Sequence, residues 1–213
     1  VKDFRAGSNK GLLLDFGLFH KKLEDLIVST SKKRSDGTSL RNNNGGTGEV
    51  NGAQLQGSYK FDEYTLLMSY SFVNSKRLDP ENGIYPSEFD QTHNLNLIGV
   101  YERSRWSFST RIRYVTGGPY TPIVGSVYDS GIDVYLPKRG DFFSERYDDF
   151  VQLDFRVDRK FIYKTWILSA YLDIQNLTNA NNGQGISYNY DYTETEKAAG
   201  TPVLPIIGVR GEF

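Results

Sequence analysis

The C-terminal segment 203–213 alternates strictly between two faces and ends on a large aromatic side chain. One face carries only apolar or small residues, namely Val203, Pro205, Ile207, Val209, Gly211 and Phe213. The other face ends in the charged residues Arg210 and Glu212. Because side chains of a strand point alternately to opposite sides, this pattern predicts a terminal β-strand with one apolar face. Such a strand is typical of outer-membrane β-barrels, in which aromatic rings lie at the boundary between lipid and water.

The composition fits a barrel strand better than a membrane-spanning helix. The 213 residues are 24% charged and have a mean hydropathy of −0.50. No apolar run approaches the roughly 20 residues of a spanning helix, whereas barrel strands expose only alternate residues to lipid. The aromatic content of 14% would also suit a soluble all-β protein rich in tyrosine. The net charge of −1 and the absence of cysteine predict no nucleic-acid partner, no disulfide and no thiolate metal site.

Alternation along the chain predicts a series of strands. The clearest is 151–160, in which Val151, Leu153, Phe155 and Val157 alternate with polar residues. The predicted strands are 12–28, 50–60, 65–75, 93–101, 106–116, 151–160, 166–175 and 203–213, with a partial strand at 2–6. A barrel normally has an even number of strands, and an open sheet edge is not tolerated in lipid. We therefore expect these strands, about nine in all, to need neighbours from outside the chain.

The predicted connections alternate strictly between short and long. The short ones are 7–11, 61–64, 102–105 and 161–165, and the long ones are 31–48, 76–91, 117–148 and 178–201. Alternation places all short turns at one end, which in outer-membrane barrels is the periplasmic end, so Phe213 is predicted to be periplasmic. Aromatic residues gather beside the short turns and predict an interfacial girdle. They are Tyr59, Phe61, Tyr64, Tyr101, Trp106, Phe161, Trp166 and Phe213.

Four segments carry a family resemblance. Asn-Gly-Gly-Thr-Gly-Glu-Val-Asn-Gly at 44–52 looks like an entrance to a downward strand, and Arg-Tyr-Val-Thr-Gly-Gly-Pro-Tyr-Thr-Pro at 113–122 looks like an exit into a large loop. Leu-Asp-Ile-Gln-Asn-Leu-Thr-Asn at 172–179 and the terminal strand follow, and the stretch 18–27 also fits. In this order and spacing, the chain resembles the C-terminal part of the barrel of TonB-dependent outer-membrane receptors.

The resemblance implies an all-β fold, an antiparallel transmembrane β-barrel of about 22 strands, of which residues 1–213 supply about the last nine. It implies that an N-terminal plug, the earlier strands and the TonB box, which engages the TonB complex, lie outside this chain. It also implies import of a scarce, bulky nutrient by energised, gated passage across the outer membrane of a Gram-negative-type bacterium. Ferric siderophores, cobalamin, saccharides and peptides are all open as ligands. Outer-membrane lipid and another protein chain at the loops are further expected partners, and no cofactor is expected.

Charged residues gather on the polar faces of the predicted strands. Facing hydrocarbon near the bilayer midplane, a lysine or arginine would cost about 2–4 kcal/mol. These side chains are therefore predicted to face the lumen, where they would hold a plug through salt bridges and water. They are Arg111, Arg113, Asp154, Arg156, Asp158, Lys160, Asp173, Arg210 and Glu212.

The long loops are predicted to contact the ligand, because function concentrates on loops that a rigid scaffold positions. Tyrosine offers contact area and a hydroxyl at low entropic cost. The candidate ligand-binding residues are Tyr120, Tyr128, Tyr135, Arg139, Tyr188 and Tyr190. Solvated loops that pack on their neighbours, or a surface for docking a partner, are the alternatives.

Catalysis has little support in the sequence. His20 and His93 are far apart, and strand-end packing suits them better than a metal or acid–base role. The chain has no Gly-x-Ser-x-Gly nucleophile elbow, and its loop aspartates lack the spacing of a calcium loop. No catalytic residue and no metal site is predicted, so an outer-membrane lipase or protease is the least favoured hypothesis. The main alternative to a transporter is a self-contained adhesion or structural barrel of about eight to ten strands that binds partners through extracellular loops.

Overall fold

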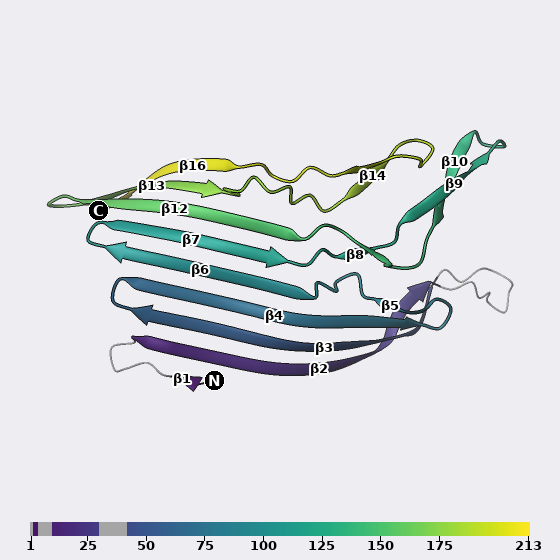
Figure 1. Cartoon of the computed structure of the whole chain (residues 1–213), viewed down its shortest axis with the longest axis horizontal. Coiled ribbons are helices and arrows are strands. Elements are labelled where there is room, and N and C mark those ends of the chain that lie inside the picture. The colour runs from purple at the N-terminus through teal and green to yellow at the C-terminus, as the bar shows by residue number, and fades with distance from the viewer. Residues whose placement is uncertain (1, 4–9, 30–41) are drawn as a thin grey trace.

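The computed structural model describes residues 2–3, 10–29 and 42–213. Within these residues, ten strands form one antiparallel sheet in the order β1-β2-β3-β4-β6-β7-β12-β13-β16, with β5 paired to β4 (Figure 1). Its strands are β1 (Lys2–Asp3), β2 (Gly11–Ser29), β3 (Asn42–Phe61), β4 (Tyr64–Asp79), β5 (Gly83–Pro86), β6 (His93–Arg103), β7 (Trp106–Val115), β12 (Phe150–Ile162), β13 (Ile167–Gln175) and β16 (Leu204–Glu212). The sheet is an all-β, antiparallel segment of a barrel wall, as predicted.

The connections segregate by length, as the sequence predicts. Short turns join β3 to β4, β6 to β7 and β12 to β13 at the end of the sheet where the C-terminus lies (Figure 1). The longer connections lie at the opposite end and contain further short strands. These are β8 (Pro119–Tyr120), β9 (Ile123–Asp129), β10 (Val134–Arg139), β11 (Glu145–Arg146), β14 (Ile186–Tyr188) and β15 (Thr195–Lys197). The sequence did not predict these loop strands, because most have only two or three residues and the longer β9 and β10 do not alternate cleanly between apolar and polar residues.

Strands β3 and β4 extend beyond their predicted bounds on the long-loop side. Strand β3 begins at Asn42 and β4 ends at Asp79, so the glycine-rich segment 44–52 lies inside a strand rather than at its entrance. Its glycines leave room for side chains of the neighbouring strand, since a Cβ on Gly46 would lie 2.5 Å from Val28 Cγ1 and one on Gly52 would lie 2.2 Å from Phe19 Cζ. Residues 4–6 of the predicted partial strand, most of the turn 7–11 and residues 31–41 of the first long loop fall outside the described residues.

The sheet is a single layer with one apolar and one polar face. Only two hydrophobic side chains among the described residues are buried, Val28 and Val115. Large apolar side chains on one face are openly exposed: Leu18 by 73%, Ile207 by 81% and Val209 by 71%. A continuous apolar surface of this size is not stable against water, so it requires contact with lipid or protein.

The apolar face ends at a definite row of residues. The aligned residues Leu18, Ala53 and Phe72 form its last apolar row on β2, β3 and β4. One step further toward the long loops, the same face carries His20, Asn51 and Asn74. The apolar stretch of β4 from Tyr64 to Phe72 therefore has about the length of a transmembrane β-strand.

In the described part of the chain, no helix is long and apolar enough to cross a membrane.

Candidate functional site

The predicted lumen-facing charges share the polar face of neighbouring strands. Arg111 on β7 lies opposite Asp154 on β12, and its Nε and Nη2 donate to Asp154 Oδ2 at 2.8 and 2.5 Å. Arg156 donates to Asp158 on the same strand at 2.7 and 2.9 Å, and Asp173 lies opposite Arg156 on β13. Each of these cations is thus held next to a carboxylate.

The Asp154 carboxylate on the polar face is buried and accepts hydrogen bonds from several neighbours. The residue is 6% exposed, and its Oδ1 accepts hydrogen bonds from Gln152 Nε2 at 2.7 Å and from the backbone N–H of Asn176 at 2.9 Å. Together with Arg111, these donors satisfy both carboxylate oxygens. Burial of a charge is tolerated under such conditions, because paired and hydrogen-bonded groups recover what desolvation costs.

Asn176 closes the base of the loop between β13 and β16. Its backbone has a φ of 50°, and the residue is 3% exposed. The side-chain amide donates to the carbonyl groups of Ala180 and Thr201, both at 2.9 Å, and accepts from the N–H of Ala180. The segment 172–179 that contributes to the family resemblance therefore contains a residue that holds the two ends of this loop together.

The long loops are tied to one another at the end of the sheet opposite the short turns. The N–H of Ile123 donates to the Tyr188 hydroxyl at 3.3 Å, and Ser126 Oγ donates to the carbonyl of Asp191 at 2.6 Å. Lys197 pairs with Asp148 at 2.7 Å. These contacts connect the loop that follows β7 to the loop that follows β13, although the two are far apart in sequence.

Three of the candidate ligand-binding residues line one pocket between these loops. Tyr120, Arg139 and Tyr188 surround a cavity of about 470 Å³, together with Phe142, Phe143 and Tyr147. The Tyr120 and Tyr147 rings stack at 4.6 Å, and burial raises the pKa of the Tyr120 phenol. The pocket offers stacked rings, a guanidinium and hydroxyl groups, and its volume lies in the usual range for small-molecule sites.

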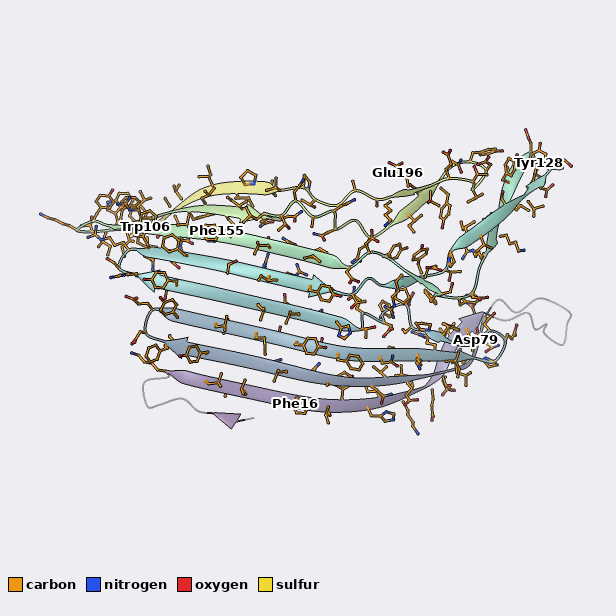
Figure 2. The ribbon with its side chains drawn as sticks, in the orientation of Figure 1. Phe16, Asp79, Trp106, Tyr128, Phe155 and Glu196 are labelled. Atoms are coloured by element: carbon orange, nitrogen blue, oxygen red, sulfur yellow. The ribbon has the colours of Figure 1, made fainter. Side chains whose placement is uncertain are left out.

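The other three candidates form a separate tyrosine cluster on the β9–β10 hairpin. Tyr128 and Tyr135 lie opposite each other, and Tyr190 meets Tyr135 edge-on with ring centroids 5.5 Å apart. Tyr190 also donates to the carbonyl of Asp133, and Tyr128 donates to the Asp133 carboxylate, which raises the pKa of Tyr128. Tyr128 lies at the far tip of the molecule (Figure 2). The Tyr190 hydroxyl thus ties the last loop to the hairpin, whereas the Tyr128 hydroxyl bonds within the hairpin itself.

Sequence reasoning missed the contact between the loop that contains β5 and the loop after β7. Arg146 pairs with the buried carboxylate of Asp90 and also donates to the carbonyl groups of Asp90 and Gly117 at 2.6 and 3.0 Å. The Tyr85 ring stacks on Phe142 and Phe143 at 5.5 and 5.8 Å. Neither pairing has a sequence signal, because the partners lie about 56 positions apart on loops whose short strands show no extended alternation.

The two histidines lie apart on the apolar face. His93 Nδ1 is 2.9 Å from the Tyr70 hydroxyl, and its ring also lies beside Phe72. His20 Nδ1 is 2.7 Å from Asn51 Oδ1. The described residues contain no group of three or more potential metal ligands of the His, Cys, Asp or Glu type.

A row of aromatic rings follows the short-turn end of the sheet. Tyr64 stacks on Tyr101 at 4.8 Å, Trp106 on Phe108 at 5.9 Å, and Trp166 on Phe213 at 5.8 Å. Figure 2 shows the concentration of rings around Trp106 at this end. Tyr64 and Tyr101 meet across neighbouring strands, where positions on one face lie about 5 Å apart, whereas Trp106 and Phe108 are neighbours on one face of β7.

Comparisons with known proteins agree with this architecture. The family model described as TonB dependent receptor-like, beta-barrel, matches residues 3–177. No curated protein matches the sequence. Two solved structures are similar in fold: the ferric citrate transporter FecA in its unliganded form, with a TM-score of 0.62 and 16% identity, and the outer membrane transporter YddB from Escherichia coli, with a TM-score of 0.58 and 14% identity.

The similarity covers 95% of this chain in both cases but only 29% of the FecA chain and 31% of the YddB chain. The chain thus spans less than a third of the solved structures that it resembles. The alternating strands, the segregated loops and the family match over residues 3–177 lead to one conclusion: this chain belongs to the TonB-dependent receptor family, within its outer-membrane β-barrel.

Proposed function

We propose that this chain forms the last strands of a TonB-dependent outer-membrane transporter that imports a scarce, bulky nutrient by energised, gated passage. The observation that carries the proposal is the pocket between the tied loops, built on a wall of the family fold. The chemistry is binding and passage without a covalent step. Ferric siderophores, cobalamin, saccharides and peptides all remain open as ligands.

The proposal includes an orientation in the membrane. The apolar face contacts lipid, the polar face lines the lumen, and the long loops are extracellular, so Phe213 lies at the periplasmic end. The aromatic row at the short-turn end and the polar row of His20, Asn51 and Asn74 support two interfaces, one at each end of the apolar band. Arg111, Arg113, Asp154, Arg156, Asp158, Asp173 and Arg210 are then residues of the lumen wall.

The partners follow from the family and extend beyond this chain. We expect the TonB complex to act through an N-terminal part of the whole protein, and a plug to contact the polar face. At the loops, another protein chain is a further candidate partner. Val127 and Leu136 lie opposite each other on the β9–β10 hairpin and are 64% and 46% exposed, which favours such docking.

Uptake by cells tests the transport proposal. A strain that lacks the gene is expected to lose growth on one nutrient of a panel of ferric siderophores, cobalamin, saccharides and peptides, and the full-length gene is expected to restore it. Dissipation of the inner-membrane proton gradient should abolish uptake while leaving surface binding intact. Binding that supports adhesion but no energy-dependent uptake of any panel member would favour the self-contained adhesion barrel instead.

Substitutions in the loop pocket test the site itself. Arg139→Gln and Tyr120→Ala are expected to weaken binding of the identified nutrient about tenfold or more, because each removes a direct contact of about 1.4 kcal/mol. Lys164→Gln, in the turn between β12 and β13 at the opposite end, is the matched control and should bind normally. Unchanged affinity in both pocket variants would place the ligand elsewhere.

A further inference from the structure

Arg113 differs from the other arginines of the polar face in its neighbours. It lies opposite Asn96 on β6 and Gln152 on β12, both of which are uncharged. The nearby Arg111 and Arg156 have carboxylate partners at 2.5 and 2.7 Å. Within the described part of the chain, Arg113 makes no ion pair, and its guanidinium lies over the Phe150 ring, with the Cζ atom 5.0 Å from the ring centroid. Its charge is therefore held in place without being neutralised.

This guanidinium faces a pocket of about 280 Å³ at the loop end of the polar face. Gln175 and Gln152 line the pocket from the strands, and Asn182 and Thr201 line it from the loop after β13. Asn182 is fixed there by two hydrogen bonds of 2.9 Å to the backbone of Val151, one through its amide nitrogen and one through its oxygen. The pocket is thus preformed and too small for a whole bulky nutrient, but it is large enough for one functional group.

The donor groups in the pocket suit an oxyanion. A guanidinium stacked on a ring keeps its edge N–H groups free for two parallel hydrogen bonds, the geometry that matches carboxylate and phosphate. Gln175 lines the same pocket, and its side chain has no hydrogen bond to another described residue, so its amide is also available. The Gln152 amide nitrogen already donates to Asp154 at 2.7 Å, and Arg111 donates to the same carboxylate. Asp154 therefore pairs with Arg111 and does not neutralise the charge of Arg113.

We infer that Arg113, with Gln175, forms an oxyanion-binding subsite at the outer mouth of the lumen, and that the imported nutrient carries a carboxylate or phosphate group. This inference rests on the proposed function for its ligand and on the polar face as the lumen wall. The subsite lies between the loop pocket and the lumen, where it would receive the charged part of a ligand that the loops have bound. A plug carboxylate is the competing partner for Arg113.

The test is site-resolved modification of arginine by phenylglyoxal in the purified full-length receptor, read by peptide mass spectrometry. Inorganic phosphate and succinate are the probes, glucose is the uncharged control, and ionic strength is held constant. We expect Arg113 to react in the absence of anion and to react about tenfold more slowly when a probe is present at ten times its Kd. Arg103, whose side chain is 72% exposed at the short-turn end, should react equally under all conditions.

A variant keeps the reporter arginine in place. Gln175→Leu is expected to raise the probe concentration needed for protection about tenfold or more, because one hydrogen bond to a charged group is lost. Gln56→Leu, the same change on the polar face of β3, should leave protection unchanged.

Two results would overturn the inference. If Arg113 reacts equally with and without either anion, the pocket binds no oxyanion. If Arg113 reacts only after urea unfolds the plug, its partner is a plug carboxylate. Protection of Arg113 in a receptor that shows no energised uptake would leave the subsite standing and refute the transport proposal alone.

Discussion

At the loop end of the sheet, single polar side chains form hydrogen bonds with backbone groups that have no partner in a strand ladder. Asp90 accepts from the N–H of Ser75, Asp149 from the N–H of Gly117, and Asn176 holds three bonds around the last loop. Asp149 lies just before β12 and Asn176 just after β13, whereas Asp90 lies in the loop between β5 and β6. Without these side chains, the backbone N–H and C=O groups there would lack hydrogen-bond partners.

Removal of the Asn176 side chain should open the last loop. Asn176→Ala strips three hydrogen bonds at a buried site and places alanine at a φ of 50°, so we expect a loss of about 2–4 kcal/mol in the stability of that loop. Limited proteolysis of the full-length receptor between residues 177 and 203 measures the change. Gln184→Ala, an exposed position in the same loop, should have no effect.

Neutralisation of Asp154 should destabilise the wall more than neutralisation of Asp158. Asp154→Asn leaves the Arg111 guanidinium beside a neutral amide at a buried site, which is expected to cost about 2–3 kcal/mol in the free energy of unfolding. Asp158 is partly exposed, so Asp158→Asn should cost less than about 1 kcal/mol. Urea titration of the receptor in lipid vesicles compares the two. Equal costs would show that burial of Asp154 is unimportant.

At the scale of elements, the loops form a connected layer. The loop with β5, the loop from β7 to β12 and the loop from β13 to β16 contact one another through side chains and rings. A connected layer holds the pocket residues at fixed separations, which lowers the entropic cost of ligand binding.

The Asp90–Arg146 pair is expected to be the strongest single tie in this layer. A double-mutant cycle of Asp90→Asn and Arg146→Gln should give a coupling energy of about 2 kcal/mol, because the Asp90 carboxylate is buried and its hydrogen bond to Arg146 is charge-assisted. The Asp148–Lys197 pair, with side chains 57% and 65% exposed, should give less than about 1 kcal/mol. Hydrogen exchange in residues 117–148 reads both cycles. Similar coupling energies for the two pairs would show that burial does not strengthen the Asp90–Arg146 pair.

At the scale of the whole molecule, the two faces of the wall have different surroundings. Leu97 lies between Met68 and Ile112 on the apolar face, and its neighbour Asn96 lies on the polar face opposite Arg113. Leu97→Arg should cost about 2–4 kcal/mol in lipid, whereas Gln56→Arg, on the polar face of β3 opposite Asp15 and Ser69, should cost less than about 1 kcal/mol. Folding of the full-length receptor into vesicles measures both. The reverse order would assign the lipid to the other face.

The sequence by itself determined the strand series, the direction of each strand's faces and the short–long order of the connections. These follow from local rules: alternation has a period of two, and turns require few residues. The predicted charges on 106–116 and 151–160 therefore share one face in the structure, with Arg111 opposite Asp154 as the register requires.

Only the tertiary structure decided which loop residues meet. The division of the six ligand candidates into a pocket and a hairpin cluster depends on contacts between loops that are far apart in sequence and have no periodic pattern. The burial of Asp154 and the free charge of Arg113 likewise depend on cross-strand neighbours, which a single strand's pattern does not specify. Local periodicity selects the wall, whereas long-range packing builds the sites on it, because side chains acquire their partners only when the strands are in register.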